Sequence, residues 1–459
     1  MFDCMKTIFV PIFQGVEAKN FLRTQIVQTL LSEENVRLIL LTDSYIGSAT
    51  RVEYYKKEFQ NERLIYETIS MQPWKKLDNF FSKLKFVLLK TKTTDLKRSM
   101  AKKAGKSALA YMIGKCANRL LARSSVRRVV RFIDFIVVRE YSYTQLFDAY
   151  IPDMVVLGDL FGEREVHLLR EAKRRGVRSV ALINSWDKVT SRCMLRLLPD
   201  YFVVYNDIVK GELIEHNEVK HERIFVGGIA QYDEYFSYMP QSRQEFFGRI
   251  HADQNKKLLL YASMGKSFSS SEWDMIDLLH GLNGRGVFGE ELEILVRFQP
   301  NDFVDEAELS KRPYLKYDYP GTRFSSKRGI DWDMNRGEVQ HLADSLYHAA
   351  LLVSYVSSIS IDAALFDKPI ICLNFAPEEY VIEFSSPMQL YWTDHFRKAL
   401  ATGGIKLVSN IPEFCNQVKE YIHSPDIDAL GRRKLVETQC KFVDGKSGER
   451  IGNFLLQCL

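Results

Sequence analysis

A group of hydroxyl residues followed by an acid marks the C-terminal half of the sequence. Ser357 and Ser358 follow an apolar run typical of a β-strand, and Asp362 lies at the predicted start of a helix. Free backbone N–H groups and the positive end of the helix dipole favour an anion such as a diphosphate there. The serine hydroxyls add donors, and Asp362 can accept hydrogen bonds from ribose hydroxyls. The structural alternative is that the serines cap the helix and Asp362 complements its dipole.

Two further predicted strands of this half end in residues suited to a phosphate. One leads into the small, basic turn that contains Ser263, Gly265 and Lys266, where the glycine lets the backbone approach a ligand. The turn lacks the spacing of a P-loop, so nucleoside triphosphatase chemistry is not indicated. The next strand ends at Arg297, whose guanidinium either binds a diphosphate in a bidentate manner or pairs with a buried acid. Together, the three strand ends predict a site for a nucleotide diphosphate or monophosphate.

Acids follow predicted strands in the N-terminal half as well. Asp159 and Asp187 come just beyond strand ends, where a carboxylate can act as a general base on an acceptor hydroxyl. Glu17, which follows the first strand, is a third and weaker candidate. The structural alternatives are a helix N-cap for Asp159 and a turn-forming side-chain hydrogen bond for Asp187.

Two series of short apolar runs, separated by helical segments, supply the elements that must position these residues. The predicted strands of the first series are 7–13, 36–41, 63–69, 154–158, 177–184, 201–205 and 224–226, and those of the second are 257–262, 292–298, 350–355 and 369–374. The predicted helices include 17–31, 163–175 and 207–217. This alternation predicts an α/β fold with doubly wound parallel sheets. We expect two Rossmann-like domains, residues 1–235 and 236–440, that face each other across a cleft.

A strongly basic segment interrupts the first series. Residues 83–131 contain fifteen Lys or Arg and one acid, whereas the net charge of the whole chain is only +5. Five apolar residues in it recur at helical spacing: Leu109, Met112, Ile113, Cys116 and Leu120. We predict a helical insertion, about residues 75–150, whose basic face is either solvated or binds an anionic membrane surface or acceptor. Nucleic acid is not expected, because no aromatic interleaving or known motif accompanies the charge.

The composition and the cysteine pattern exclude several classes of protein. With 459 residues and 46% hydrophobic residues, the chain is a folded multidomain protein and neither a disordered nor a disulfide-rich one. The seven cysteines are scattered without zinc-site spacing, and His341 and His348 lack a third ligand, so no metal site is predicted. The N-terminal stretch predicts a strand instead of a signal peptide, and no apolar run has the length of a membrane span. We expect a cytoplasmic protein, at most peripheral on the inner face of the membrane.

Three stretches resemble a known family. The stretch from SWDKVTSR to the motifs Val226-Gly-Gly228 and Tyr232-Asp233 resembles the linker side of bacterial surface-polysaccharide glycosyltransferases of the GT-B fold. QHLADSLYHAALLVSYVSSISIDAALFDKPIICLNF is similar to the donor-nucleotide segment of these proteins. That segment is shared with CDP-glycerol glycerophosphotransferases and, more distantly, with UDP-N-acetylglucosamine 2-epimerases. The stretch from Asp444 to Ile451 looks like the turn that opens the final GT-B helix. The resemblance covers about residues 150–459.

The resemblance implies a GT-B fold, no bound metal, and a final helix in residues 441–459 that crosses back to the first domain. It implies a nucleotide-activated donor in the C-terminal domain, held by Ser357, Ser358 and Asp362 with Arg297 nearby. Relatives often have His where Gln299 stands here, and Gly in place of Asp367. The first departure argues against the epimerase and glycerophosphate mechanisms.

The leading hypothesis is a cytosolic, metal-independent glycosyltransferase that needs no cofactor beyond its nucleotide-sugar co-substrate. It moves the sugar to a surface glycan or a lipid-linked glycan acceptor, with Asp187 or Asp159 as the base if the reaction inverts. One alternative is a CDP-glycerol-type polyol-phosphate transferase. The other is a non-catalytic, membrane-associated scaffold that retains a GT-B-like shape.

Overall fold

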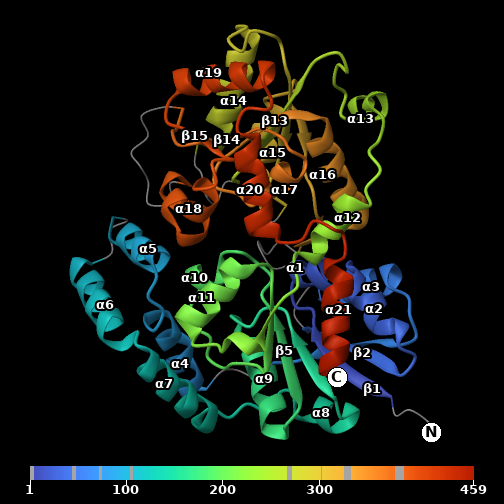
Figure 1. Ribbon diagram of the computed structural model, residues 1–459, viewed down its shortest axis with the longest axis vertical. Helices are drawn as coiled ribbons and strands as arrows, with labels where there is room; N and C mark the ends of the chain where they lie inside the picture. The colour runs from blue at the N-terminus through green and yellow to red at the C-terminus, as the bar shows by residue number, and fades with distance from the viewer. Residues whose placement is uncertain are drawn as a thin grey trace. The chain divides into compact units, whose positions relative to one another are not determined.

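The chain folds into two compact units, shown in Figure 1. The first comprises Met1–Ser237, Arg323–Asp333 and Cys440–Leu459, and the second comprises Tyr238–Thr322 and Met334–Gln439. The computed structural model describes residues 5–43, 48–71, 75–103, 107–265, 271–300, 302–324, 332–377 and 387–459.

The first unit is built on a seven-stranded parallel sheet with the order β3-β2-β1-β4-β5-β6-β7. Its strands are β1 (Lys6–Pro11), β2 (Val36–Asp43), β3 (Leu64–Ile69), β4 (Met154–Leu157), β5 (Arg178–Leu182), β6 (Tyr201–Val204) and β7 (Ile224–Val226). All seven strands predicted for the first series are confirmed. The strand order reverses between β1 and β4, and this switch point is where doubly wound sheets bind ligands.

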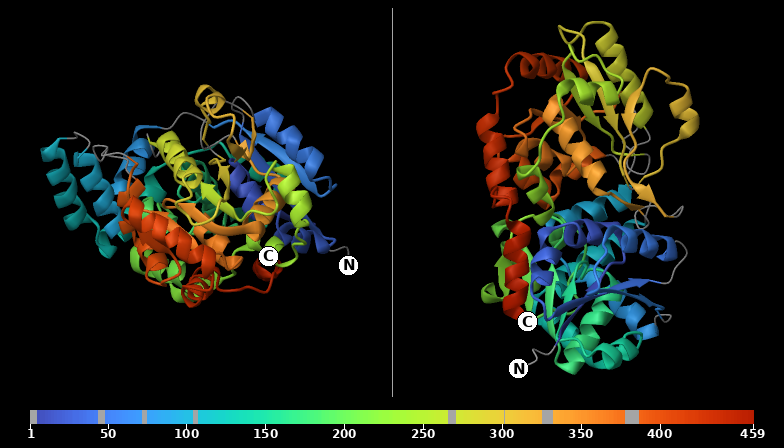
Figure 2. Two further views of the ribbon diagram at one scale, coloured as in Figure 1. Left: turned by 90° about the horizontal axis from the view of Figure 1, so that it is seen from above. Right: turned by 90° about the vertical axis from the view of Figure 1, so that its right-hand side faces the viewer.

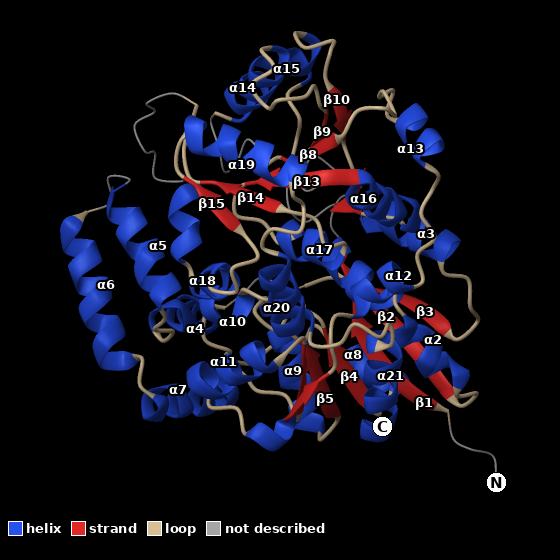
Figure 3. Cartoon of the chain, turned by 45° about the horizontal axis from the view of Figure 1, so that its top comes forward, coloured by secondary structure: helices blue, strands red, loops and turns tan. Residues whose placement is uncertain are grey.

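The second unit repeats this topology in a six-stranded parallel sheet, β10-β9-β8-β13-β14-β15. Its strands are β8 (Leu258–Ala262), β9 (Glu293–Arg297), β10 (Lys316–Asp318), β13 (Ala349–Ser354), β14 (Ile370–Leu373) and β15 (Lys406–Val408). The switch point lies between β8 and β13. Both sheets are visible as red arrows in Figure 3. Two short strands, β11 (Thr322–Arg323) and β12 (Trp332–Asp333), form a separate small sheet.

Helices flank both sheets. Those of the first unit are α1 (Gly15–Glu17), η1 (Ala18–Leu22), α2 (Gln25–Ser32), α3 (Ser48–Glu58), α4 (Lys76–Val87), α5 (Lys92–Lys103), α6 (Ala108–Leu121), α7 (Ser124–Val137), α8 (Thr144–Tyr150), α9 (Glu163–Arg175), α10 (Lys188–Ser191), α11 (Asp207–Asn217), η2 (His221–Arg223), η3 (Ala230–Tyr232), α12 (Asp233–Phe236) and α21 (Ser447–Cys458). The helices of the second unit are α13 (Arg243–Arg249), α14 (Glu272–Gly284), α15 (Glu306–Ser310), α16 (Arg336–His348), α17 (Ile359–Leu365), η4 (Pro387–Trp392), α18 (Asp394–Leu400), α19 (Ile411–His423) and α20 (Ala429–Cys440).

The prediction of one continuous helix over residues 17–31 is wrong. Residues Ala18–Leu22 form a π-helical turn, and Thr24 then has an extended backbone. The Thr24 hydroxyl accepts a hydrogen bond from the Ile26 N–H at 3.3 Å and so caps α2. A threonine hydroxyl competes for backbone groups in this way, which explains why the helical pattern is interrupted at this position.

Alternating residues of the first sheet build two separate cores. Along β1, Phe9 belongs to the core on one face, whereas Ile8 and Val10 belong to the core on the other. Successive side chains of a strand point to opposite faces, so an apolar run is buried on both sides when helices cover both.

The C-terminal helix α21 packs on α2 within the first unit, as the red and blue helices of Figure 2 show. A Cβ atom on Gly452 would lie 2.5 Å from the Thr29 Cβ, so this close approach requires glycine. The Asp233 carboxylate accepts hydrogen bonds from the backbone N–H groups of Ser447 at 3.0 Å and Gly448 at 2.6 Å. Asp233, in the motif Tyr232-Asp233, thus pairs with backbone N–H groups at the N-terminus of α21 that have no partner within the helix.

The four helices α4 to α7 form the insertion in the first unit, and their colour runs from blue to cyan in Figure 1. A buried ion network attaches them to the rest of the unit. Arg196 pairs with Asp78 of α4 at 2.7 Å, with Asp134 of α7 at 2.8 Å and with Glu163 of α9. All four side chains are buried, and each carboxylate has a partner, as a buried charge requires.

Candidate active site

The turn after β13 brings the predicted hydroxyl residues to the carboxyl edge of the second sheet. Ser358 occupies the N-cap of α17 and is exposed, and Ser357 is half-buried. The Ser357 hydroxyl accepts a hydrogen bond from the Ile359 N–H at 3.4 Å, which is the capping role of the structural alternative. Asp362 is buried in the first turn of α17. The N–H groups of Ser360 and Ile361 in this turn donate to the carbonyl oxygens of Ser357 and Ser358 at 3.3 and 2.9 Å.

The turn after β8 is shaped by Gly265. Its φ of +82° lies in the left-handed region, and a Cβ there would be 2.4 Å from Asp302 Oδ2 and 2.9 Å from Gln299 Oε1. The Gly265 N–H donates to Glu272 Oε2 at 2.8 Å. The backbone conformation therefore favours glycine, and a larger residue would also displace the ends of the Asp302 and Gln299 side chains. The predicted neighbour Lys266 lies outside the described residues.

Neighbouring strands place these two turns side by side. β8 and β13 pair directly, with Ala262 opposite Ser354 in the register. Ser263 and Gly265 therefore leave the sheet beside the chain that leads to Ser357. This is the switch point of the sheet, the place at which doubly wound sheets bind ligands.

Arg297 also reaches this edge, but its guanidinium is engaged in a buried ion pair. It lies opposite Ala262 in the sheet, and its backbone C=O accepts a hydrogen bond from the Ser263 N–H at 3.0 Å. Its Nη1 lies 3.3 Å from Asp318 Oδ2, and Asp318 Oδ1 lies 2.6 Å from His341 Nε2. Of the two alternatives predicted for Arg297, the structure shows the ion pair with an acid.

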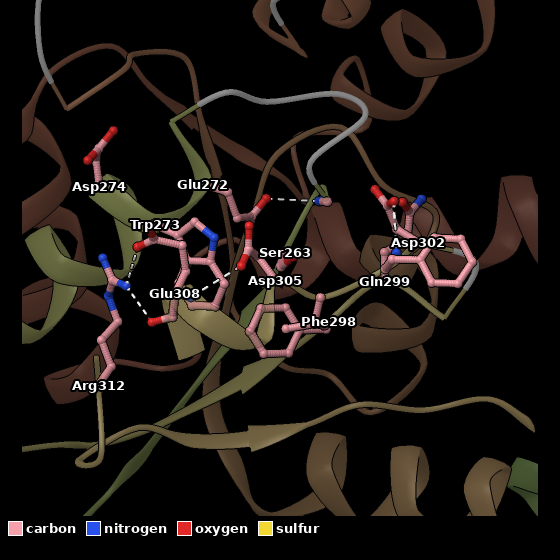
Figure 4. Close-up of a pocket in the computed structure, with 13 residues that line it drawn as sticks. Ser263, Glu272, Trp273, Asp274, Phe298, Gln299, Asp302, Asp305, Glu308 and Arg312 are labelled. Carbon is pink, nitrogen blue, oxygen red and sulfur yellow. Dashed lines mark hydrogen bonds and ion pairs between the residues drawn. The ribbon is translucent and has the colours of Figure 1, made fainter. Parts of the chain in front are cut away.

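A cavity of about 470 Å³ opens beside the turn after β8 (Figure 4). Ser263 and Gly265 line it, whereas Ser357, Ser358 and Asp362 do not. The remaining lining is mainly acidic and aromatic, with one cationic residue, Arg312. Its other members are Glu272, Trp273, Asp274, Phe298, Gln299, Asp302, Phe303, Val304, Asp305 and Glu308. Carboxylates accept hydrogen bonds from hydroxyl groups but repel phosphate, so the cavity suits the hydroxyl-rich part of a ligand.

Glu272 was not predicted as a site residue. It belongs to the first turn of α14 and is buried, and this burial raises the pKa of its carboxyl to about 7. Acids in a first helical turn usually complement the helix dipole, so the sequence offers no signal that separates Glu272 from that common role.

A second group of acids gathers at the switch point of the first sheet. Glu17 follows β1, Asp159 follows β4, and Glu165 lies in the first turns of α9. Lys188 Nζ lies 2.7 Å from Asp159 Oδ1, and the Asp159 N–H donates to Glu165 Oε2 at 2.8 Å. Gln14 Nε2 is 3.4 Å from Asp159 Oδ2. Asp159 is partly exposed, whereas Glu17 and Glu165 are buried.

Burial makes the two glutamates of this group weak acids. Desolvation, followed by the charge of Asp159, raises the pKa of Glu17 to about 8. Desolvation, followed by the charge of Glu17, also raises the pKa of Glu165 well above its ordinary range. Glu17 was the weaker candidate of the sequence, and Glu165 was missed because nothing in its local pattern distinguishes it from other acids at a helix start.

Glu17 should make the stability of the protein depend on pH. Its pKa rises from 4.5 in an unfolded chain to about 8, so the folded protein holds an extra proton between these values. The free energy of unfolding therefore falls as the pH rises through this window. We expect Glu17→Gln to reduce the fall between about pH 5 and about pH 8 by on the order of 3 kcal/mol. Urea unfolding at several pH values measures this change.

The control for this experiment is Glu62→Gln, which changes an exposed glutamate of the same unit. It should leave the pH dependence as it is in the wild type. Equal pH profiles for Glu17→Gln and the wild type would show that Glu17 is ionised in the folded protein at neutral pH.

The hydrogen bonds of Asp187 differ from those of Glu17, Asp159 and Glu165. Both of its carboxylate oxygens accept hydrogen bonds from serine hydroxyls, one from Ser185 and one from Ser191 at 2.9 Å. These bonds close the turn before α10, which is the kind of local role that the structural alternative describes. The carboxylate of Asp159, by contrast, is paired with the buried Lys188.

One group of metal-ligand types occurs among the described residues, Asp78, Glu163 and His167. Its carboxylates already pair with Arg196, and Lys85 Nζ lies 2.6 Å from Glu163 Oε1. Cationic side chains therefore occupy the place in which a metal ion would balance the charge.

No protein-family model matches the chain, and no curated protein matches it. Solved structures do match it over nearly the whole length. S. aureus MnaA in a co-structure with UDP is 14% identical, with a TM-score of 0.54 over 99% of this chain and 98% of that one. UDP-GlcNAc 2-epimerase from Neisseria meningitidis bound to UDP-GlcNAc is 11% identical, with a TM-score of 0.54 over 99% and 100%.

A glycosyltransferase from Rickettsia africae is 10% identical, with a TM-score of 0.50 over 99% of this chain and 100% of that one. Identities this low leave only the shared architecture as a basis for comparison. Together with the two parallel sheets, these likenesses confirm the prediction that the chain has a two-domain α/β fold of the GT-B type.

Proposed function

We propose that the chain is a GT-B glycosyltransferase. It moves a sugar from a nucleotide-activated donor, bound by the second unit, to a surface glycan or a lipid-linked glycan acceptor, without a bound metal. The main support is that Ser263 and Gly265 on one turn, and Ser357 and Asp362 on the other, follow the two strands that flank the switch point. The same fold holds UDP or UDP-GlcNAc in two of the similar structures.

The donor's diphosphate is assigned to the start of α17. The exposed Ser358 hydroxyl supplies a donor, and the helix dipole balances the charge of the leaving nucleotide. Asp362 accepts hydrogen bonds from the ribose. The acid-lined cavity beside Gly265 accepts hydroxyl groups of the donor.

Asp159 is the better candidate for the general base of an inverting transfer. It lies at the switch point of the first sheet, where its oxygens contact Lys188 and Gln14. The oxygens of Asp187, by contrast, are held by Ser185 and Ser191 close by in the chain. Gln299 lines the cavity where relatives often have His, which favours transfer over the epimerase and glycerophosphate mechanisms.

Thermal unfolding with a panel of UDP, CDP, GDP and CMP tests the donor site. A nucleotide present at 100 times its dissociation constant should stabilise the protein by about 2.7 kcal/mol. Nucleotide release is then measured with nucleotide sugars and with CDP-polyols. Turnover only with a CDP-polyol would replace the proposal by the polyol-phosphate transferase, and no stabilisation by any nucleotide would favour the non-catalytic scaffold.

Asp362→Ala should raise the donor KM by about 10- to 100-fold, because it removes hydrogen bonds from ribose hydroxyls to a charged acceptor. Steady-state kinetics with varied donor measure the effect. The matched control is Glu306→Ala, which removes an exposed acid from the first turn of α15 in the same unit. If both variants have the kinetics of the wild type, Asp362 serves only the helix dipole.

A further inference from the structure

Helix α7 presents its apolar side to solvent and its polar side to the protein. Its buried polar residues are Arg127, Arg131 and Asp134. Its exposed apolar residues form one stripe at helical spacing: Val129, Phe132, Ile133, Ile136 and Val137. A surface helix of a soluble domain has the opposite arrangement, so this stripe needs a partner that is apolar.

Helix α6 directly precedes α7 and continues the pattern. Its exposed apolar residues are Leu109, Met112, Ile113, Leu120 and Leu121. Four of them belong to the helical face predicted from the sequence, and the structure turns this face outward. The buried polar residue of α6 is Asn118, whose Nδ2 donates to the carbonyl oxygens of Val87 and Leu89. We call the exposed apolar residues of α6 and α7 the insertion surface.

The polar surroundings of the insertion surface are basic. Exposed cationic side chains on α4, α6, α7 and their flanks are Lys75, Lys76, Lys83, Arg119, Arg123, Arg128 and Arg139. The acids among these helices contribute little negative charge to the surface. Asp78, Asp134 and Glu140 are buried, and Asp95 of α5, whose side chain is 47% exposed, pairs with Arg98 at 3.0 Å.

We propose that the insertion surface binds the face of an anionic lipid bilayer. The apolar stripes of α6 and α7 enter the boundary between headgroups and acyl chains, and the surrounding lysines and arginines contact anionic headgroups. Attachment is peripheral, because no helix in the described part of the chain is long and apolar enough to cross a bilayer. A second copy of the chain fits less well, since an isologous contact would bring the basic rims together.

This proposal names a partner that the proposed function leaves open, and it does not depend on the donor chemistry. It also differs from the expectation drawn from the sequence, which assigned the contact to basic residues alone. Apolar burial and charge attraction both contribute here, so binding should need anionic lipid and should weaken at high salt without being abolished.

Vesicle flotation of the full chain tests the proposal. Vesicles of pure phosphatidylcholine are compared with equimolar mixtures of phosphatidylcholine and phosphatidylglycerol, at low and high salt. We expect binding to the mixed vesicles only. The double variant Phe132→Ser/Ile136→Ser should weaken this binding at least about tenfold, because each side chain loses its burial among acyl chains. The fold should survive, since both positions are exposed.

The control variant Met239→Ser/Leu430→Ser removes two apolar side chains that are more exposed but lie outside the insertion. It should bind vesicles like the wild type. The charge variant Arg123→Glu/Arg128→Glu should lower binding and its salt dependence. Equal binding to both kinds of vesicle would overturn the anionic part of the proposal.

Binding to neither vesicle, with a solution dimer that Phe132→Ser/Ile136→Ser dissociates, would assign the insertion surface to contact between copies and overturn the proposal. The nucleotide panel is measured on the same variants. Vesicle binding without nucleotide binding refutes only the proposed transferase, and the reverse result refutes only the membrane surface.

Discussion

Replacing Arg196 by methionine is expected to unfold the first unit or leave it barely stable. The guanidinium is 1% exposed and pairs with Asp78, Asp134 and Glu163. Without it, the three buried carboxylates keep one partner each. Lys85 remains beside Glu163, Arg170 beside Asp134 and His167 beside Asp78. Breaking a buried ion pair costs about 3–5 kcal/mol. A domain has only about 5–15 kcal/mol of stability to lose. Urea unfolding followed by circular dichroism measures the effect.

Two further variants make this prediction specific. Arg192→Met changes an exposed arginine four residues earlier in the chain and should unfold like the wild type. Adding Asp78→Asn to Arg196→Met removes the carboxylate that keeps only His167 as an ion-pair partner, and it should recover part of the lost stability. A wild-type midpoint for Arg196→Met would mean that the acids are neutral or solvated in the folded protein.

The same network explains how the insertion is held. Asp78 comes from α4, Asp134 from α7 and Glu163 from α9, so one arginine joins two inserted helices to the helix that covers the sheet. Arg170 of α9 adds a second link, because its Nη2 lies 2.8 Å from Asp134 Oδ1. Charged groups therefore occupy the inner side of α7, and its apolar residues remain outside.

Asp159→Asn is expected to lower kcat by about 10²- to 10⁴-fold, because an amide cannot accept the proton of the acceptor hydroxyl. The donor KM should change little, since the donor residues belong to the second unit. Asp187→Asn should have a smaller effect, because its carboxylate is held by Ser185 and Ser191. Initial rates at saturating donor, with the fold checked by unfolding, separate the two acids.

The control for Asp159 is Lys188→Gln, which removes the cation of the ion pair and leaves the carboxylate in place. If proton transfer by Asp159 matters, this variant should retain far more activity than Asp159→Asn. A large loss in Asp187→Asn together with wild-type rates in Asp159→Asn would reverse the assignment of the base.

Much of the fold was predictable because its strands are buried on both faces. Every residue of β4, β8, β9 and β14 is buried, and each strand is a run of non-polar residues apart from Glu293 and Arg297 at the two ends of β9. The helix α9 was predicted with its observed ends, since Glu163 and Glu165 begin it, Lys173 to Arg175 end it, and Gly176 follows with a φ of +70°. The strand ends then identified the turns at Gly265 and Ser357.

The sequence by itself thus determined two doubly wound sheets and the turns at their carboxyl edges, because burial and helix ends leave local patterns. Other features depend on contacts between distant residues. The edge strands β10 and β15 are three-residue segments without an apolar run. The raised pKa values of Glu17 and Glu165 follow from the burial of both carboxyls together, which no local sequence pattern indicates.

The orientation of α6 and α7 shows most clearly what only the tertiary structure determines. Their amphipathic spacing predicts a helix with two faces, but spacing does not say which face turns inward. Arg127 and Arg131 are buried on α7 because Glu218, far along the chain, pairs with both, and Asp134 is buried because it pairs with Arg196. These long-range charge pairs, absent from any local window of the sequence, turn the apolar face outward.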